Sequence, residues 1–239
     1  MTITSSHNDK LKEIRKLARR RTREDTSRFV AEGEDLVTAA AAAGWTPLTL
    51  LAAADSGLDG DEVEGALLAS VSALGSGSRQ LAVYESRWAA AAGPLCVALW
   101  GVGDPGNVGT ILRSALAFGA SSVALAPGCA DPFAPKAVRA SMGAIFQVPV
   151  ARVGTLAQLP GEHVALVAHE GSPLAGPTGT AAGELTLLVG AERDGLPADV
   201  VAACDRVAHI PIAAESLNAA MAATVALYEL TRGGASGDA

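Results

Sequence analysis

From Pro94 onward, short apolar runs alternate with segments of helical periodicity, and this alternation constrains the fold more than any other feature. Each run is continuously apolar, as expected of a strand covered on both faces of its sheet. The expected strands are LCVALW at 95–100, SSVALAP at 121–127, QVPVAR at 147–152, HVALVAH at 163–169, LTLLVG at 185–190 and RVAHIPI at 206–212. The pattern predicts an α/β fold with an open, mostly parallel sheet, whose ligands bind at the carboxyl ends of its strands.

Helical periodicity fills the intervals between these strands and follows the last of them. The expected helices cover residues 107–119, 134–145, 196–204 and 215–233. Because they alternate with the strands, we expect them to cover both faces of the sheet.

The first part of the chain predicts a smaller α/β unit. Leu11, Ile14 and Leu17 recur at helical spacing in a helix expected from Asn8 to about Arg21. After it we expect a short extended piece, a helix that ends at Gly44, a strand at 47–53, a helix at 61–74 and a strand at 79–85.

The Ala-rich stretch SRWAAAAGP, residues 86–94, ends in Gly-Pro and is the expected linker. We therefore expect an N-terminal domain over residues 1–88 and a larger domain over residues 94–239.

Charge is distributed unevenly along the chain. The formal net charge is −7, yet residues 10–28 hold nine of the eighteen Lys and Arg residues and only three acids, so this segment carries +6 and the remainder −13. A basic block on an acidic body is typical of a protein that binds a polyanion, although a solvated helix face has the same composition. The residues expected to contact such a polyanion are Lys12, Arg15, Lys16, Arg19, Arg20, Arg21 and Arg23, with Lys136 and Arg139 as further candidates.

Several classes of protein are disfavoured by composition. The three cysteines are widely spaced and show neither a disulfide framework nor a metal-binding pair, and the four histidines show no ligand spacing, so we expect no metal. The first residues are polar and do not resemble a signal peptide. No apolar run reaches the ~18 residues needed to cross a membrane. A cytoplasmic protein is therefore expected.

Gly101, Gly103 and Gly106 have the G-x-G-x-x-G spacing of a dinucleotide-binding turn. That fingerprint also needs an acidic residue at the end of the second strand, but here the second apolar run ends in Ala-Pro-Gly and Asp131 lies beyond it. Asn107 is expected to cap the helix only after the third glycine, which also departs from the fingerprint. The glycines are therefore expected to form a tight strand-to-helix turn, and a nicotinamide-dependent oxidoreductase is kept as an alternative.

Three other stretches, each at a strand-to-helix junction, carry the most specific signal. They are Asn107-x-Gly109-x-x-x-Arg113, then LLVGAERDGL at 187–196, then HIPIAAESLNAAMAATVALYE at 209–229. Together and in this order they resemble the three motifs of the SpoU (TrmH-like) family of RNA ribose 2′-O-methyltransferases, within the SPOUT superfamily. The stretch from His7 to Gly44 resembles the substrate-recognition domain attached to members that act on ribosomal RNA.

The resemblance implies a function, a cofactor and a set of site residues. It implies S-adenosyl-L-methionine as cofactor, a deep trefoil knot in the C-terminal domain, a homodimer and ribosomal RNA, 23S rRNA first, as substrate. The catalytic residues that it implies are Asn107, Arg113, Glu192, Ser216 and Asn218. The cofactor-binding residues that it implies are Gly190, Ile210, Pro211, Leu217 and Asn218. The loop between Ile-Pro and Ser-Leu-Asn is shorter here than is common in the family.

Each of these polar residues also has a structural interpretation. A guanidinium stays protonated, so Arg113 is expected to bind the target phosphate and orient the hydroxyl rather than to act as a free base, but it could also be a surface ion-pair partner. Asn107, Asn218 and Ser216 could cap helices, and Glu192 could be an exposed acid. For the whole chain, transfer RNA as substrate and a non-catalytic RNA-binding protein are the further alternatives.

Overall fold

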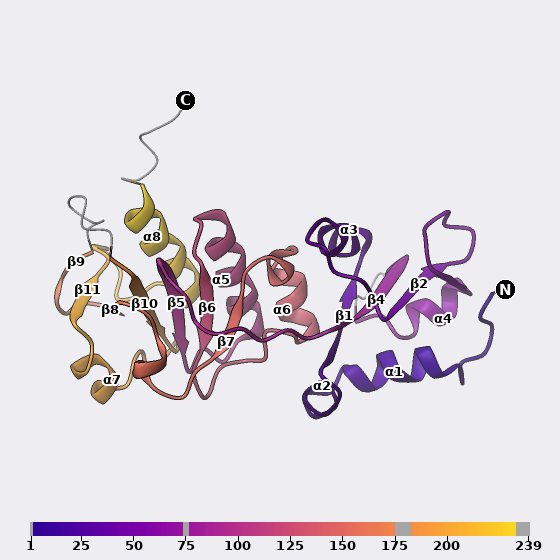
Figure 1. Ribbon diagram of the computed structural model, residues 1–239, viewed down its shortest axis with the longest axis horizontal. Coiled ribbons are helices and arrows are strands. Elements are labelled where there is room, and N and C mark those ends of the chain that lie inside the picture. The colour runs from indigo at the N-terminus through magenta and orange to yellow at the C-terminus, as the bar shows by residue number, and fades with distance from the viewer. Residues whose placement is uncertain (1, 74–76, 175–182, 233–239) are drawn as a thin grey trace.

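The computed structural model describes residues 2–73, 77–174 and 183–232, and in these residues it shows two sheets (Figure 1). The larger sheet has seven strands in the order β7-β6-β5-β10-β8-β11-β9, and all of its paired neighbours are parallel. Its strands are β5 (Leu95–Trp100), β6 (Ser122–Leu125), β7 (Val150–Arg152), β8 (Glu162–Val167), β9 (Ser172–Pro173), β10 (Leu185–Gly190) and β11 (Arg206–His209). The predicted open parallel sheet is confirmed, with the two-residue β9 added at its edge.

The inner strands β5, β6, β8 and β10 are buried on both faces, which explains their apolar sequences. In β5, Cys96 and Ala98 belong to one apolar cluster, while Val97 and Leu99 belong to the cluster on the opposite face. All four side chains are fully buried. This is the pattern expected of a parallel sheet enclosed between helices.

Helices cover both faces of the larger sheet (Figure 1). One face packs against α5 (Pro105–Ala117), α6 (Pro135–Ala140), the single turn η1 (Ala144–Phe146) and α8 (Ala219–Thr231). The other face packs against α7 (Ala198–Ala202) and the turn η2 (Leu156–Gln158). All four expected helices are present, but α5 begins and ends two residues earlier than expected, and the segment expected at 134–145 is divided into α6 and η1. The helices α7 and α8 are shorter than expected, and residue 233 lies outside the described residues.

The start of α5 differs from the sequence expectation. Asp104 is the N-cap, and its carboxylate accepts the backbone N–H of Asn107 at 3.0 Å, so Asn107 lies inside the first turn and does not cap the helix. Gly101 adopts a φ of +69°, as the predicted tight turn requires. Farther along, a Cβ on Gly109 would lie 2.2 Å from the Ala137 carbonyl oxygen. This glycine therefore allows α5 and α6 to pack closely.

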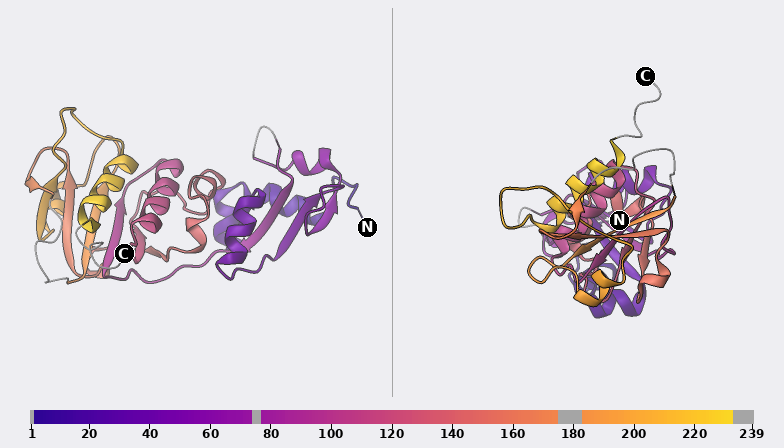
Figure 2. Two further views of the ribbon diagram at one scale, coloured as in Figure 1. Left: turned by 90° about the horizontal axis from the view of Figure 1, so that it is seen from above. Right: turned by 90° about the vertical axis from the view of Figure 1, so that its left-hand side faces the viewer.

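The smaller sheet lies at the other end of the elongated molecule (Figure 2). Its order is β1-β4-β2-β3, from β1 (Arg28–Glu32), β2 (Thr49–Ala53), β3 (Asp61–Val63) and β4 (Gln80–Glu85). Its helices are α1 (Asp9–Leu17), α2 (Arg20–Thr26), α3 (Glu34–Ala42) and α4 (Gly65–Ala69). The predicted stripe of Leu11, Ile14 and Leu17 packs on this sheet, as expected.

Two predictions for this smaller unit were wrong in part. The helix expected to run to Arg21 is interrupted at Arg19, whose extended backbone starts α2. The segment expected to be one helix over 61–74 begins as β3, which pairs in parallel with β2, and only Gly65–Ala69 are helical. Residue 74 lies outside the described residues.

An aromatic cluster joins the two sheets. Six of the nine aromatic residues lie there in ring contact with one another, and they are Phe29, Trp45, Tyr84, Trp88, Phe133 and Phe146. Residues 86–94 contain no helix or strand but run along β7, where the Ala89 N–H donates to the Val150 carbonyl at 2.8 Å. The expected linker is thus packed against the larger sheet. Within the described residues, no helix is long and apolar enough to cross a membrane.

Candidate functional site

Three strands of the larger sheet end beside a large cleft. Neighbouring strands β10, β8 and β11 end at Gly190, Val167 and His209, at the carboxyl edge where open α/β sheets bind ligands. The cleft has a volume of about 760 Å³, and its lining residues fall within 166–170, 189–204 and 207–222. This volume is typical of a pocket for a small-molecule cofactor.

Most of the expected cofactor-binding residues line this cleft. Gly190, Ile210 and Leu217 do so, together with Glu192 and Ser216 from the catalytic set. Pro211 and Asn218, by contrast, are not among the lining residues. Sequence reasoning missed the wall formed by residues 166–170, although the general preference for strand carboxyl ends applies to β8 as much as to β10.

The loop after β10 folds back tightly on its own strand. Ala191 and Gly195 exchange two backbone hydrogen bonds, at 3.1 and 3.0 Å. A Cβ on Gly190 would lie 2.2 Å from the carbonyl carbon of Gly195, so only glycine fits beneath this loop. The glycine therefore shapes one wall of the cleft through chain packing.

One polar side chain from each of the three motif stretches meets the others in a chain of hydrogen bonds. Asn218 Nδ2 donates to Asn107 Oδ1 at 3.1 Å, and Asn107 Nδ2 donates to Glu192 Oε1 at 2.6 Å. Asn218 is also the N-cap of α8, since its Oδ1 accepts the backbone N–H groups of Ala220 and Met221. Ser216, an alternative candidate for that cap, does not fill it.

The donor and acceptor of each of these two hydrogen bonds follow from the groups at the ends of the series. Helix N–H groups bind the carbonyl oxygen of Asn218, so its amide nitrogen must be the donor to Asn107. The carboxylate of Glu192 accepts at the other end. Asn107 keeps one N–H and one lone pair that these bonds do not use, which suits a group that orients a hydroxyl.

Arg113 does not join this hydrogen-bonded chain. It lies six residues after Asn107 on α5, which is roughly 9 Å farther along a helix axis. Its side chain is exposed and forms no salt bridge within the described residues, so the surface ion-pair alternative has no partner there. An exposed guanidinium without an acidic partner is free to bind an anion.

The basic block is only partly available for a ligand. Arg23 is 6% exposed, pairs with Asp131 at 2.7 Å and donates to the carbonyl groups of Leu17 and Ala18. This burial disfavours the expected contact of Arg23 with RNA, because its charge is used to hold α1 and α2 against Asp131 of the larger unit. Four exposed members of the expected RNA-binding set have an acidic partner: Lys12 with Asp9, Arg20 with Glu24, Arg21 with Asp25 and Lys136 with Asp104.

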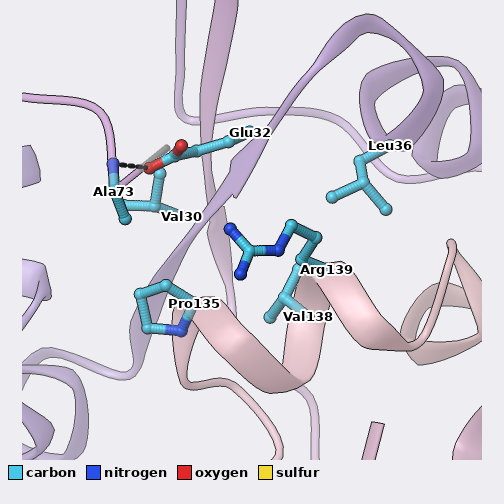
Figure 3. A pocket seen from close by; sticks show the side chains of 7 residues that line it. All are labelled: Val30, Glu32, Leu36, Ala73, Pro135, Val138 and Arg139. Carbon is cyan, nitrogen blue, oxygen red and sulfur yellow. Dashed lines mark hydrogen bonds between the residues drawn. The ribbon is translucent and has the colours of Figure 1, made fainter. Parts of the chain in front are cut away.

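The remaining candidates in the RNA-binding set are also exposed. Arg15 donates to the Ser6 carbonyl at 2.9 Å, whereas Lys16 and Arg19 extend from the end of α1 and the turn after it. Arg139 reaches from α6 toward β1 beside a small crevice between the two units (Figure 3). The crevice holds only about 10 Å³, which is too small for a nucleotide.

Shifts in the pKa of one carboxyl and three thiols bear on these assignments. Lys136 donates to Asp104 at 2.7 Å and lowers the pKa of that carboxyl, so the cap of α5 stays ionised. Burial raises the pKa of the thiols of Cys96, Cys129 and Cys204, which makes them poor nucleophiles. Within the part of the chain that the structure describes, no group of His, Cys, Asp or Glu is arranged to hold a metal ion.

Comparison with known proteins gives consistent matches over nearly the whole chain. Residues 94–228 match the model of the SpoU rRNA Methylase family, and residues 8–85 match that of an MRM3-like substrate binding domain. An uncharacterized tRNA/rRNA methyltransferase of Mycobacterium tuberculosis is 36% identical over 190 residues, 69% of this chain and 56% of that protein. This chain thus spans little more than half of that relative.

Two further matches extend over whole chains. The 23S rRNA (guanosine(2553)-2′-O)-methyltransferase RlmP of Bacillus subtilis is 31% identical over 95% of this chain and 98% of its own length. The crystal structure of an AdoMet-bound rRNA methyltransferase from Sinorhizobium meliloti superposes with a TM-score of 0.86 at 32% identity and covers 98% of both chains.

Proposed function

The chain belongs to the SpoU rRNA methylase family, and from this we propose that it transfers the methyl group of S-adenosylmethionine to a ribose 2′-hydroxyl of ribosomal RNA. The observation that carries the proposal is the chain of hydrogen bonds from Glu192 through Asn107 to Asn218 beside the 760 Å³ cleft. RlmP, similar over almost its full length, acts on 23S rRNA, which makes 23S rRNA the expected substrate. Transfer RNA is the alternative.

The cleft suits S-adenosylmethionine in size and in chemistry. Leu166, Leu196, Ile210 and Leu217 offer apolar contacts, and the strand ends offer backbone N–H and C=O groups, the usual composition of a cofactor pocket. Bound there, S-adenosylmethionine supplies a methyl group that its sulfonium already activates.

The protein's own residues then have to position the nucleophile. A ribose hydroxyl is a weak acid, so its alignment with the methyl group supplies much of the rate. Asn107 presents its unused N–H and lone pair to the ribose, and Glu192 and Asn218 fix the orientation of that amide. Arg113 binds the phosphate of the target nucleotide, because a guanidinium remains protonated and is no general base.

The two units take different roles in this proposal. Residues 1–88 form the RNA-recognition domain, supported by the match to an MRM3-like substrate binding domain, and residues 94–239 form the methyltransferase domain. The trefoil knot and the cytoplasmic location stay predictions.

A homodimer is supported by an apolar face on α8. Met221, Val225 and Tyr228 recur at i, i+4 and i+7 and are 63%, 42% and 54% exposed. Leu116 on the neighbouring α5 is 38% exposed. Since Ala219 and Ala222 of the same helix line the cleft, a partner seated on this face would lie close to the cofactor.

The experiment that tests the activity is transfer of the methyl group from labelled S-adenosylmethionine to 23S rRNA by the purified protein. Binding of NAD without binding of S-adenosylmethionine would instead favour an oxidoreductase. Binding of RNA without any transfer would favour a non-catalytic RNA-binding protein.

A further inference from the structure

A second hollow lies on the same carboxyl edge as the cleft, and the three motifs do not account for it. Two adjoining cavities of about 110 and 210 Å³ share Trp88, Asp131 and Arg152 in their walls. They lie at the ends of β6 and β7, and Arg20 from the start of α2 lines the larger one. Elements of both the smaller and the larger unit therefore form this hollow.

The hollow contains a stacked pair that is suited to an unpaired base. The guanidinium carbon of Arg152 lies 3.9 Å from the centre of the Trp88 ring. Phe133 also packs against that half-buried ring, with ring centres 5.1 Å apart and planes at 86°. Arg152 itself is exposed. RNA-binding proteins stack splayed-out bases on arginine planes and aromatic rings of this kind.

The charges around the hollow favour an anion. Four arginines line the two cavities, Arg20, Arg23, Arg28 and Arg152, together with the acids Glu24 and Asp131. Arg20 pairs with Glu24 at 2.9 Å, and Arg28 pairs with Glu13 at 2.6 Å. Asp131 is neutralised by the buried Arg23. Arg20 lowers the pKa of Glu24, with weaker contributions from Arg152 and Arg23. Within the described residues Arg152 forms no salt bridge, so its charge is available to a phosphate.

The hollow also lies close to the proposed active site. In the sheet, β5 alone separates β6 from β10, which is a distance of roughly 10 Å between strands in register. The loops that follow β6 and β5 touch, since a Cβ on Gly128 would lie 3.3 Å from Gly101 Cα. An RNA strand lying along this edge of the sheet would contact both the hollow and the proposed active site.

We infer that this hollow, the Trp88–Arg152 subsite, binds an unpaired nucleotide that flanks the target ribose, with its base stacked on Arg152 and its phosphate held by Arg152 and Arg20. The inference rests on the proposed RNA substrate. It adds to the expected RNA-binding set two residues outside the basic block, and it gives Arg20 a specific place in that set.

The test compares three substitutions, with a transcript of 23S rRNA as the probe. Arg152→Gln removes both charge and stacking plane, and Arg152→Lys keeps only the charge. The matched control is Arg87→Gln, because Arg87 is also exposed and also lies 3.9 Å above a tryptophan ring, that of Trp45, but lines neither cavity. The affinity of each protein for the transcript is measured by filter binding.

Arg152→Gln is expected to weaken RNA binding roughly 5- to 150-fold, the range found for the loss of one stacked base. Arg152→Lys should lie between Arg152→Gln and the wild type, and Arg87→Gln should match the wild type. RNA should also quench tryptophan fluorescence, and Trp88→Phe should remove most of that quenching. Equal affinities for Arg152→Gln and Arg87→Gln would overturn the subsite.

Binding of S-adenosylmethionine separates a failure of the subsite from a failure of the proposed function. If Arg152→Gln binds the cofactor and the transcript as the wild type does, only the subsite is wrong. If the folded wild type binds neither the cofactor nor the transcript, the proposed function and the subsite both fall.

Discussion

At the scale of single residues, the role proposed for Arg113 rests on its exposed position and on the lack of an acidic partner among the described residues. It is exposed on α5, away from the hydrogen bonds that join Asn107 to Glu192 and Asn218. Arg113→Ala is therefore expected to lower kcat by roughly 10²- to 10³-fold, as loss of a positioned charge does. Affinity for S-adenosylmethionine should not change, because Arg113 does not line the cleft.

Calorimetry with the cofactor and single-turnover methyl transfer measure these two effects separately. Arg113→Lys is the matched variant, since it keeps the charge and loses the planar donor array. Its rate of methyl transfer should fall between those of the wild type and Arg113→Ala. Loss of cofactor binding in a folded Arg113→Ala protein would place the residue in the cofactor site instead.

At the scale of elements, α1 and α2 carry cations with two different functions. Lys16, Arg19 and Arg21 are exposed, whereas Arg23 is buried against Asp131. Replacing the three exposed residues by Gln should weaken RNA binding. It should also reduce the slope of log affinity against log salt concentration by about 2 to 3, because fewer counterions are released when fewer phosphates are contacted. Thermal stability should hardly change.

Arg23→Gln is the contrasting variant for this prediction. It leaves Asp131 without its buried partner and should cost about 3–5 kcal/mol of unfolding free energy. Affinity for RNA is measured at several salt concentrations, and unfolding is followed in urea. If the triple variant keeps the salt dependence of the wild type, this face of α1 and α2 is exposed to solvent but does not contact RNA.

The sequence predicted the strands of the larger sheet better than the elements of the smaller unit, for a physical reason. Strands such as β5 and β10 are buried on both faces and must be continuously apolar. By contrast, β3 is a three-residue edge strand with two exposed acids, and its existence depends on pairing with β2. Just after the break at Arg19, Arg23 contacts Asp131, which lies 108 residues away, and no local sequence pattern predicts such a contact.

At the scale of the whole molecule, the exposed face of α8 predicts self-association. The wild type should have twice the 24.0 kDa mass of one chain in light scattering at micromolar concentration. Changing Met221 and Tyr228 to Glu should yield a monomer, since buried charges would face each other across the interface. Leu48→Glu is the control, because Leu48 is 51% exposed on the smaller unit. A monomeric wild type would contradict the proposal.

The assembly of the candidate site could be predicted only by resemblance. Asn107 and Asn218 are 111 residues apart, and no periodicity implies that their side chains meet. The wall at 166–170 and the pair of Trp88 with Arg152 belong to none of the three motifs, so only the folded chain reveals them. These features lie together at the carboxyl edge of the larger sheet because of the order of its strands. The apolar pattern of a single strand does not encode that order.

The central claim is that the site joined by Glu192, Asn107 and Asn218 methylates a ribose of ribosomal RNA. The most direct measurement incubates the purified protein with labelled S-adenosylmethionine and rRNA from a strain that lacks this protein, then digests the RNA to nucleosides. We expect label in a single 2′-O-methylated nucleoside of 23S rRNA, and no label with Asn107→Ala. Label on a base, or no label in RNA despite bound cofactor, would contradict it.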